Sequence, residues 1–380
     1  MKFKNKEDIL EYARILSKKG EIQTAIQVFK KVNTIYPNDK TSLYQISRLY
    51  LEMKNYPKAC TYYDKLLEIY PDNFQAKFDL AFIYLLNRDL KKGFTHYETR
   101  LEFKNFNHFL VNKYPLKLKK FNNKKVFIYW EQGYGDTINF IRYVNEVLLH
   151  TKKIDIYIQK PLVRLMKYNF KTIKFVDVLE YKNKKYDYII PLMSLPYLLK
   201  LETFTPLSKY LKIRKKSKAK KKKSKVLKIG LCWQGEHKNK RDYYRSFQID
   251  DLLKLLFNID DKYRKNIKLY SLQQDITLNN KGITNLGTGF TDFYDTAVAI
   301  DKLDLVITVD TAICHLSASL GKKTYLLIPY LSDWRWGLHL HKSDLYKSIK
   351  YFRQEEKGFW EKTLKEVVKK IVKKLDKKYE

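Results

Sequence analysis

The first hundred residues alternate apolar and polar positions with the spacing of amphipathic helices, and the pattern repeats along the chain. A shift of 34 places superposes small residues on small residues, aromatic residues on aromatic residues and proline on proline. The superposed positions are Ala13 with Ser47 and Ala81, Leu16 with Tyr50 and Tyr84, Ala25 with Ala59 and Gly93, Phe29 with Tyr63 and Tyr97, and Pro37 with Pro71. Small residues let antiparallel helices approach closely, and a proline ends the second helix of a pair. The pattern therefore predicts helical hairpins in series.

A 34-residue period with these features resembles the tetratricopeptide repeat. Two repeats are complete, and a third, degenerate one ends at residues 93–98. We place this helical region at residues 1–112. The alternative is an unrelated helical bundle whose period is a coincidence.

After Lys113 the apolar positions gather in short runs that alternate with helical stretches, which is typical of doubly wound parallel sheets. In residues 113–213, a first half, the predicted strands are 126–129, 154–159, 174–178 and 186–190. In residues 226–380, a second half, they are 227–233, 267–272, 305–309 and 324–328, with helices at 250–257, 292–303, 312–320 and 360–375. The lysine-rich residues 214–225 are predicted to link the halves.

The predicted fold class is therefore α/β, with two doubly wound Rossmann-like halves preceded by an all-α repeat region. Two such halves form a cleft, and ligands of these folds bind beyond the carboxyl ends of the strands. Candidate chemistry is accordingly sought in the segments that follow strands.

The most informative segment is the end of the predicted strand 305–309. A helix of small residues follows Asp310 at once and stops at Gly321, a residue suited to the position after a helix. The free N–H groups and positive dipole of such a helix start can hold a diphosphate. Thr311 adds a hydroxyl, and His315 lies one turn further on. The alternative is that Asp310 only caps the helix and His315 is a hydrogen-bonded core histidine.

The second segment follows the first strand of the first half. Gly133 and Gly135 let the backbone turn tightly and approach a ligand, but Ile138 stands where a dinucleotide fingerprint needs a third glycine. Asp136, at a predicted helix N-terminus, could take a proton from an acceptor hydroxyl. Glu131, at the strand end, is the second carboxylate in reach. The alternative for Asp136 is a helix N-cap.

Two weaker segments lie in the second half. Gln234 follows its first strand, and Gln273, which could line the nucleotide base, follows its second. The basic residues after Gln234 are Lys238, Lys240, Arg241 and Arg245. Their charge could neutralise a leaving diphosphate, or they could form a solvated basic loop.

Together these segments resemble bacterial proteins that join tetratricopeptide repeats to a glycosyltransferase domain of the GT-B fold, related to the heptosyltransferases of glycosyltransferase family 9. The matching segments keep the family's order and are 131–137, 142–143, 309–312, 315–316, 321–322, 329, 333–336 and 352–354. The resemblance implies an inverting, metal-independent transfer of a sugar from a nucleotide-diphospho-sugar to a glycan or protein acceptor, with no cofactor. The absence of an Asp-x-Asp pair from the chain agrees with this mechanism.

By this match Asp136 takes the place of the general base, with Glu131 as second choice. Asp310 would hold the loop or the donor sugar, and Thr311, Ala312 and His315 would bind the diphosphate. The full set of predicted donor-binding residues is Gly133, Gly135, Gln234, Arg245, Gln273, Asp310, Thr311, Ala312 and His315. The repeats would bind an acceptor protein or a partner enzyme. Trp334 and Trp336 are expected to pack in a core. The alternative function is an inactive repeat scaffold or protein-binding module with a vestigial sugar-nucleotide fold.

Composition changes this picture little. The net charge of +35 comes from lysines spread along a chain also rich in Asn, Ile, Tyr and Phe, as AT-rich codons would produce, and no nucleic-acid module is recognisable. Cys60, Cys232 and Cys314 are too few for a disulfide framework or a zinc site. We find neither a membrane-spanning apolar run nor the apolar stretch of a signal peptide. We expect a cytoplasmic protein, soluble or peripheral at the inner membrane face, with no nucleic-acid partner.

Overall fold

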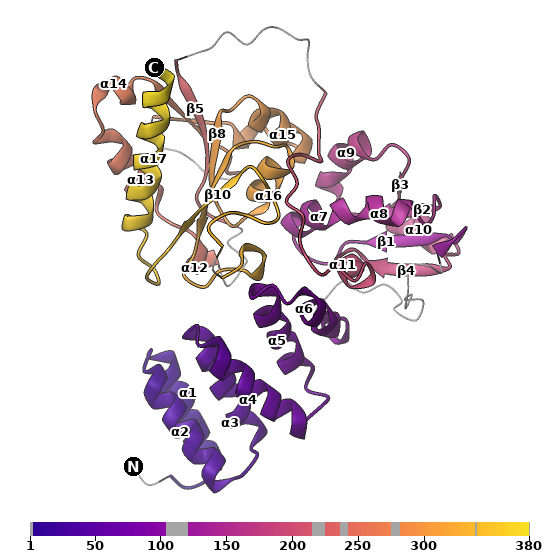
Figure 1. Ribbon diagram of the computed structural model, residues 1–380, viewed down its shortest axis with the longest axis vertical. Coiled ribbons are helices and arrows are strands. Elements are labelled where there is room, and N and C mark those ends of the chain that lie inside the picture. Colours follow the sequence, from indigo (N-terminus) through magenta and orange to yellow (C-terminus); the bar gives the residue numbers. More distant parts are fainter. Residues whose placement is uncertain are drawn as a thin grey trace. The chain divides into compact units, whose positions relative to one another are not determined.

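The computed structural model describes residues 3–103, 121–214, 225–235, 242–274, 282–338 and 340–379. The chain divides into two compact units, which Figure 1 colours along the sequence. Residues 1–105 and 333–338 form the first unit, and the rest of the chain forms the second. The two α/β halves, which the sequence separates near residues 213–226, thus belong to one compact unit. Most of the predicted linker, residues 215–224, lies outside the described residues.

The described part of the first unit is built from consecutive helices. They are α1 (Lys6–Lys18), α2 (Ile22–Ile35), α3 (Lys40–Glu52), α4 (Tyr56–Ile69), α5 (Phe74–Leu86), α6 (Leu90–Tyr97) and the 3-10 helix η1 (Glu98–Glu102). Most of the α-helices begin in the same way. The side chain of the N-cap residue, an Asn or an Asp, accepts a hydrogen bond from the N–H of the third helical residue. These capping residues are Asn5, Asp39, Asn55, Asn73 and Asp89.

The small residues that recur with the 34-residue period lie where paired helices touch. Ala25 and Ala59 are completely buried, and Gly93 occupies the equivalent place in the third pair. A Cβ atom at Gly93 would lie 2.6 Å from the Leu85 side chain, so α5 and α6 approach too closely for any larger residue. The degenerate third repeat therefore keeps the helix packing of the other two.

Residues 333–338 belong to the first unit although they lie far along the chain. They include the short 3-10 helix η7 (Trp334–Trp336), whose carbonyl groups accept hydrogen bonds from Arg88. The ring of Trp334 meets the rings of Phe94 and Tyr97 edge-on. Trp334 and Trp336 are almost fully buried, which confirms the prediction that they pack in a core. That core is in the helical unit, whereas their position in the sequence assigns them to the second α/β half.

The first α/β half contains a parallel sheet in the order β3-β2-β1-β4. Its strands are β1 (Val126–Tyr129), β2 (Ile154–Tyr157), β3 (Lys174–Phe175) and β4 (Tyr188–Pro191). The connecting helices are α7 (Tyr134–Phe140), η4 (Ile141–Tyr143), α8 (Val144–Leu148), α9 (Lys160–Asn169), α10 (Val178–Lys182), η5 (Leu192–Ser194) and α11 (Leu195–Leu198). The four strands predicted for this half are confirmed, with shorter bounds at β2 and β3 and with β4 beginning two residues later than predicted.

The second half contains a larger parallel sheet in the order β10-β9-β8-β5-β6-β7. Its strands are β5 (Leu227–Cys232), β6 (Ile267–Ser271), β7 (Ile283–Asn285), β8 (Leu305–Val309), β9 (Thr324–Ile328) and β10 (Ile349–Arg353). Its helices are α12 (Asp242–Arg245), α13 (Ile249–Phe257), α14 (Asp261–Arg264), the 3-10 helix η6 (Gly287–Gly289), α15 (Phe293–Asp301), α16 (Ala312–Ser319) and α17 (Glu361–Tyr379). The edge strands β7 and β10 were not predicted from the sequence.

Helices cover both faces of the second sheet, with α13 and α17 on one side and α15 and α16 on the other (Figure 1). Trp360 and the apolar residues Leu364, Val367 and Ile371 pack into the core that α13 and α17 share with the strands. Their spacing is that of one helix face. The predicted fold class, an all-α repeat region followed by parallel α/β halves, is confirmed. None of the described helices is both long enough and apolar enough to cross a membrane.

In each sheet, the direction in which successive strands are added reverses beside the strand that comes first in the sequence. In the first half the chain runs outward from β1 to β2 and β3 and then crosses to β4 on the other side. In the second half it runs from β5 to β6 and β7 and then crosses to β8. Ligands of doubly wound folds bind at this switch point, beyond the carboxyl ends of the strands. The segments after β1, β5 and β8 are therefore where a site is expected.

Candidate active site

Asp136 lies at the start of α7, just beyond the carboxyl end of β1. It is the third helical residue, and its Oδ2 accepts the N–H of Gly133 at 2.9 Å. Gly133 itself is the N-cap residue, so the alternative that Asp136 is the N-cap is wrong. The carboxylate nevertheless stabilises the helix start, because it satisfies a backbone donor in the first turn.

Glu131 lies at the same switch point and is buried. Its Oε2 accepts the N–H of Met193 at 3.3 Å, and Met193 follows β4. The side chain thus joins the ends of the neighbouring strands β1 and β4. This contact gives Glu131 a structural part whether or not it takes part in catalysis.

The two glycines of this segment do not make the tight turn that the sequence analysis expected. Gly133 has an ordinary φ of −69°, and neither it nor Gly135 is among the glycines with positive φ. Close approach explains Gly135 instead. A Cβ atom there would lie 3.0 Å from His315 Cδ2 and 3.4 Å from Ala312 Cα. Gly135 therefore lets α7 of the first half pack directly against α16 of the second.

The start of α16 has the features expected of an anion site. Thr311 is the N-cap residue, and its side chain does not bond the first-turn N–H groups. Its hydroxyl lies 3.2 Å from Thr308 Oγ1 and 3.6 Å from Cys232 Sγ. The alternative that Asp310 caps this helix is wrong, because Asp310 precedes the N-cap residue. The helix start is thus left without a side-chain cap, as a phosphate-binding helix requires.

His315 is buried in the packing between α7 and α16. Its Nδ1 lies 2.8 Å from the hydroxyl of Tyr346, which also donates to Asn139 Oδ1 at 3.3 Å. This arrangement is the hydrogen-bonded core histidine that the sequence analysis gave as the alternative. Donor binding by His315 stays a prediction.

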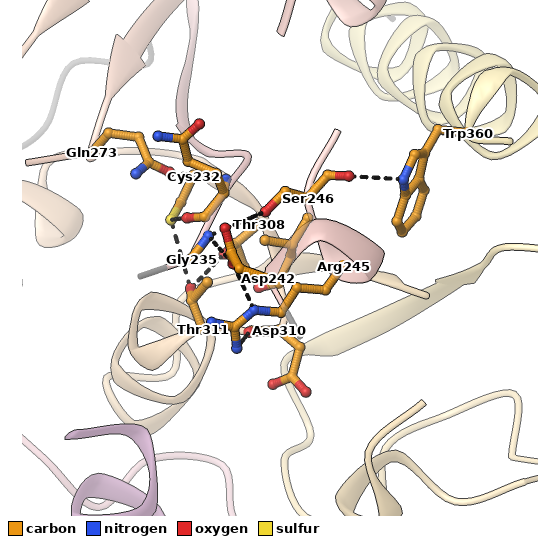
Figure 2. A network of polar contacts seen from close by, with 12 residues as sticks. Cys232, Gly235, Asp242, Arg245, Ser246, Gln273, Thr308, Asp310, Thr311 and Trp360 are labelled. Carbon is orange, nitrogen blue, oxygen red and sulfur yellow. Dashed lines mark hydrogen bonds and ion pairs between the residues drawn. The ribbon is translucent and has the colours of Figure 1, made fainter. Parts of the chain in front are cut away.

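The segment after β5 meets the segment after β8 around Arg245, as Figure 2 shows. Nη1 of Arg245 donates to the carbonyl oxygen of Asp310 at 2.8 Å. The N–H of Gln234 donates to Oε1 of the buried Gln273 at 3.1 Å. The structure therefore brings Gln234, Gln273 and Arg245 to the switch point beside Thr311. The predicted basic residues Lys238, Lys240 and Arg241 lie outside the described residues.

Sequence reasoning missed one member of this cluster, Asp242. Its carboxylate is buried and forms an ion pair with Arg245, with 2.9 Å between Oδ1 and Nε. The signal that could have found it is the Asp-x-x-Arg spacing, which puts both side chains on one face of a helix. Tyr346 and Asn139 were missed as well, and no local pattern marks them.

Two further contacts join the α/β halves. The guanidinium of Arg142, from the first half, lies against the rings of Tyr210 and Tyr346, at 4.8 and 4.4 Å from their centroids. Its Nη1 donates to the carbonyl oxygen of Leu345 at 2.9 Å. Nearer the surface, Arg164 of α9 forms ion pairs with Asp292 and with Asp295 of α15. One buried contact and one exposed contact thus add to the packing of α7 on α16.

The thiols near the site are not nucleophiles at neutral pH. Cys232 and Cys314 are completely enclosed, and burial raises the pKa of each thiol above its usual 9.0. Each therefore stays protonated at neutral pH and behaves as a small apolar residue. Within the described part of the chain, no group of three His, Cys, Asp or Glu side chains could hold a metal ion.

An open hollow of about 520 Å³ lies elsewhere in the first half. Its lining includes Lys167, Lys171 and Phe170, near the end of α9, and Glu180 of α10. None of the predicted site residues lines it. The candidate site therefore rests on the two switch points and not on this hollow.

Family models of the tetratricopeptide repeat match residues 10–39 and 41–73. The two complete repeats that were predicted are thereby confirmed, and the N-terminal region carries tetratricopeptide repeats. Among curated protein sequences, none matches this chain.

Several solved structures are similar to the chain. A glycosyl transferase family 9 protein from Veillonella parvula is 14% identical, with a TM-score of 0.47, over 67% of this chain and 98% of that protein. An O-GlcNAc transferase mutant from Thermobaculum terrenum is 12% identical, with a TM-score of 0.33, over 100% of this chain and 92% of that one. A double mutant of MamA RS-1 is 23% identical, with a TM-score of 0.24, over 26% of this chain. The present chain spans only 55% of the length of that MamA protein.

Proposed function

We propose that the second unit is a glycosyltransferase, which moves a sugar from a nucleotide-diphospho-sugar to a glycan or protein acceptor with inversion and without a metal ion. The observation that carries the proposal is the direct packing of α7 on α16 at Gly135. It brings the switch point with Asp136 next to the switch point with the uncapped helix start and Arg245. A carboxylate that can take a proton thus lies near groups that can hold a diphosphate.

In the proposed mechanism Asp136 accepts the proton of the acceptor hydroxyl as that oxygen attacks the anomeric carbon. The bond from this carbon to the diphosphate breaks, and the nucleoside diphosphate leaves with the electron pair. The first-turn N–H groups of α16, the Thr311 hydroxyl and the Arg245 guanidinium stabilise the negative charge that develops. Attack from the face opposite the leaving group inverts the anomeric configuration.

The remaining predicted residues have supporting parts in this proposal. Gln273 and Gln234 would border the nucleotide, and Asp310 would hold the donor sugar or its own loop through its carbonyl group. Glu131 would keep the strand ends in register through Met193. The tetratricopeptide repeats would bind the acceptor protein or a partner enzyme, as stacked helix pairs commonly do.

The test combines donor binding with transfer. The wild-type chain is titrated calorimetrically with ADP, GDP, UDP and CDP, and transfer from the matching nucleotide-diphospho-sugars is followed by mass spectrometry. We expect Asp136→Asn to keep nucleotide affinity but to lower turnover by a factor of about 10² to 10⁴, because only the proton acceptor is lost. Unchanged turnover in this variant would remove Asp136 as the base.

A control separates catalysis from folding. Glu131→Gln keeps a side-chain oxygen for the Met193 N–H but removes the charge, so we expect a smaller effect on turnover than that of Asp136→Asn. If the wild-type chain binds nucleotide but transfers no sugar, the inactive scaffold is the better description. If it binds none of the nucleotides, the proposed function is wrong.

A further inference from the structure

Asp242 is a buried carboxylate that accepts hydrogen bonds from three residues of the segment after β5. Its Oδ1 accepts the N–H of Gly235 at 2.8 Å and the Nε–H of Arg245 at 2.9 Å. Its Oδ2 accepts the hydroxyl of Ser246 at 3.0 Å. Ser246 in turn offers its carbonyl oxygen to Nε1 of Trp360 at 3.1 Å, at the start of α17 (Figure 2). The carboxylate is thus satisfied and held in place from several sides.

The same contacts fix the guanidinium of Arg245. Nε is bonded to Asp242, and Nη1 is bonded to the carbonyl oxygen of Asp310, the residue that precedes the N-cap of α16. A Cβ atom at Gly235 would collide with Nη2 of Arg245 and with Oδ1 of Asp242, so a larger residue there would displace both side chains. A planar group that is bonded along two of its edges has little freedom to rotate. Arg245 is therefore already oriented beside the helix start.

We propose that Asp242 is a positioning residue for the donor diphosphate, because it holds the Arg245 guanidinium beside the first turn of α16. This inference rests on the proposed function and adds a named residue to its donor site. A free arginine would lose rotational freedom when it bound an anion, and Asp242 removes that loss in advance. It also gives the partly buried guanidinium a counter-charge before an anion binds.

The negative charge of Asp242 weakens the binding of an anion, whereas its contact with Arg245 strengthens that binding. A carboxylate near a diphosphate repels it, so the benefit of Asp242 comes from position alone. Asn at this place keeps an oxygen for the N–H of Gly235 and for Nε of Arg245, and its amide can face the hydroxyl of Ser246. Asp242→Asn therefore keeps the position and removes the charge, whereas Asp242→Ala removes both.

Calorimetric titration with pyrophosphate, and with the nucleoside diphosphate that the wild-type chain binds, tests this inference. We expect Arg245→Ala and Asp242→Ala each to weaken binding about tenfold, the scale of one charge-assisted hydrogen bond. The double variant Asp242→Ala with Arg245→Ala should bind no more weakly than Arg245→Ala alone, because Asp242 acts through the arginine. Asp242→Asn should bind as tightly as the wild-type chain or more tightly.

A structural role alone gives a different pattern. It lowers the melting temperature of Asp242→Ala without changing affinity, or it gives losses that add in the double variant, and either result overturns the inference. Asp260→Asn is the matched control, because Asp260 also accepts a backbone N–H at the start of a short helix in the same half. We expect its affinity to equal that of the wild-type chain.

A second variant covers the case in which Asp242→Ala does not fold. Arg245→Lys keeps the positive charge, but one ammonium group cannot replace a guanidinium that bonds Asp242 through Nε and Asp310 through Nη1. We expect a loss of about tenfold for this variant too, and wild-type affinity would overturn the inference. If the wild-type chain itself binds neither pyrophosphate nor any nucleoside diphosphate, the failure belongs to the proposed function and the assignment of Asp242 falls with it.

Discussion

At the scale of single residues, Gly135 has the clearest physical reason for its identity. It has no unusual backbone angle, yet the space for a Cβ atom is taken by His315 and by the backbone of Ala312. The contact joins the helix that carries Asp136 to the helix that starts at Ala312. A single added methyl group would therefore act on both switch points at once.

Gly135→Ala should lower the free energy of unfolding by about 1–3 kcal/mol, the usual cost of overpacking a tight contact. Since His315 and α16 must shift, nucleotide affinity should fall as well. Chemical denaturation and calorimetry measure the two effects. Gly289→Ala is the control, because nothing lies within 4 Å of a Cβ atom there. Equal stability of the two variants would show that the space between α7 and α16 accommodates a Cβ atom at position 135.

At the scale of elements, residues 333–338 show how a short segment completes a repeat unit. Within the described residues no further repeat follows the third helix pair, α5 and α6, and terminal repeats need a cap. Trp334 packs against Phe94 and Tyr97 there, and Arg88 bonds two carbonyl groups of the segment. We conclude that this segment serves as part of the cap of the helical unit.

Trp334→Ala should therefore destabilise the helical unit by about 3–5 kcal/mol, as expected when a buried tryptophan is truncated. Hydrogen-exchange mass spectrometry should show faster exchange in α5 and α6 and no change in α13 or α17. Phe359→Ala is the matched control, since the side chain of Phe359 is 67% exposed and its removal should change stability by less than about 0.5 kcal/mol. If hydrogen exchange in α5 and α6 rises equally in both variants, residues 333–338 do not cap the helical unit.

At the scale of the whole molecule, the chain must hold two α/β halves together despite a net charge of +35. The buried contact of Arg142 with Tyr210 and Tyr346 needs no acid, because the aromatic faces and a carbonyl oxygen receive the guanidinium. The exposed contact uses acids. A hydrogen bond from the Thr291 hydroxyl and the ion pair with Arg164 lower the pKa of Asp295 below its usual 3.8.

The sign of this shift sets the pH dependence. Because the pKa of Asp295 is lowered in the folded state, its contact with Arg164 stabilises the fold fully above about pH 4. This contribution to stability is lost as the pH falls through the folded-state pKa of Asp295. Because the Arg164 side chain is 49% exposed, Arg164→Ala should cost no more than about 1 kcal/mol at neutral pH. The difference from the wild-type chain should shrink at high salt and below pH 4.

Thermal unfolding at several pH values and salt concentrations measures this effect. Arg264→Ala removes an ion pair of similar exposure that lies within the second half, so it serves as the control. We expect Arg164→Ala, and not Arg264→Ala, to speed proteolysis of loops between the halves. Identical behaviour of the two variants would mean that the Arg164 contact does not hold the halves together.

The sequence by itself determined the elements that depend on local pattern. The 34-residue period identified the repeats, because each helix pair must present small residues to its partner and ends in the same way. The buried strands β1, β5, β8 and β9 were found for a similar reason, since runs of apolar residues are placed in the core of a folded chain. The segments after β1 and β8 were found because chemistry in these folds lies beyond strand ends.

Only the tertiary structure decided which of these segments meet. The edge strands β7 and β10 escaped prediction, because pairing with one neighbour, and not their own composition, makes them strands. Sequence could not show that Trp334 packs with the repeats, that His315 faces Tyr346, or that Arg245 bonds the carbonyl group of Asp310. These contacts join residues from different elements. A local sequence pattern carries no information about residues that become neighbours only when the chain folds.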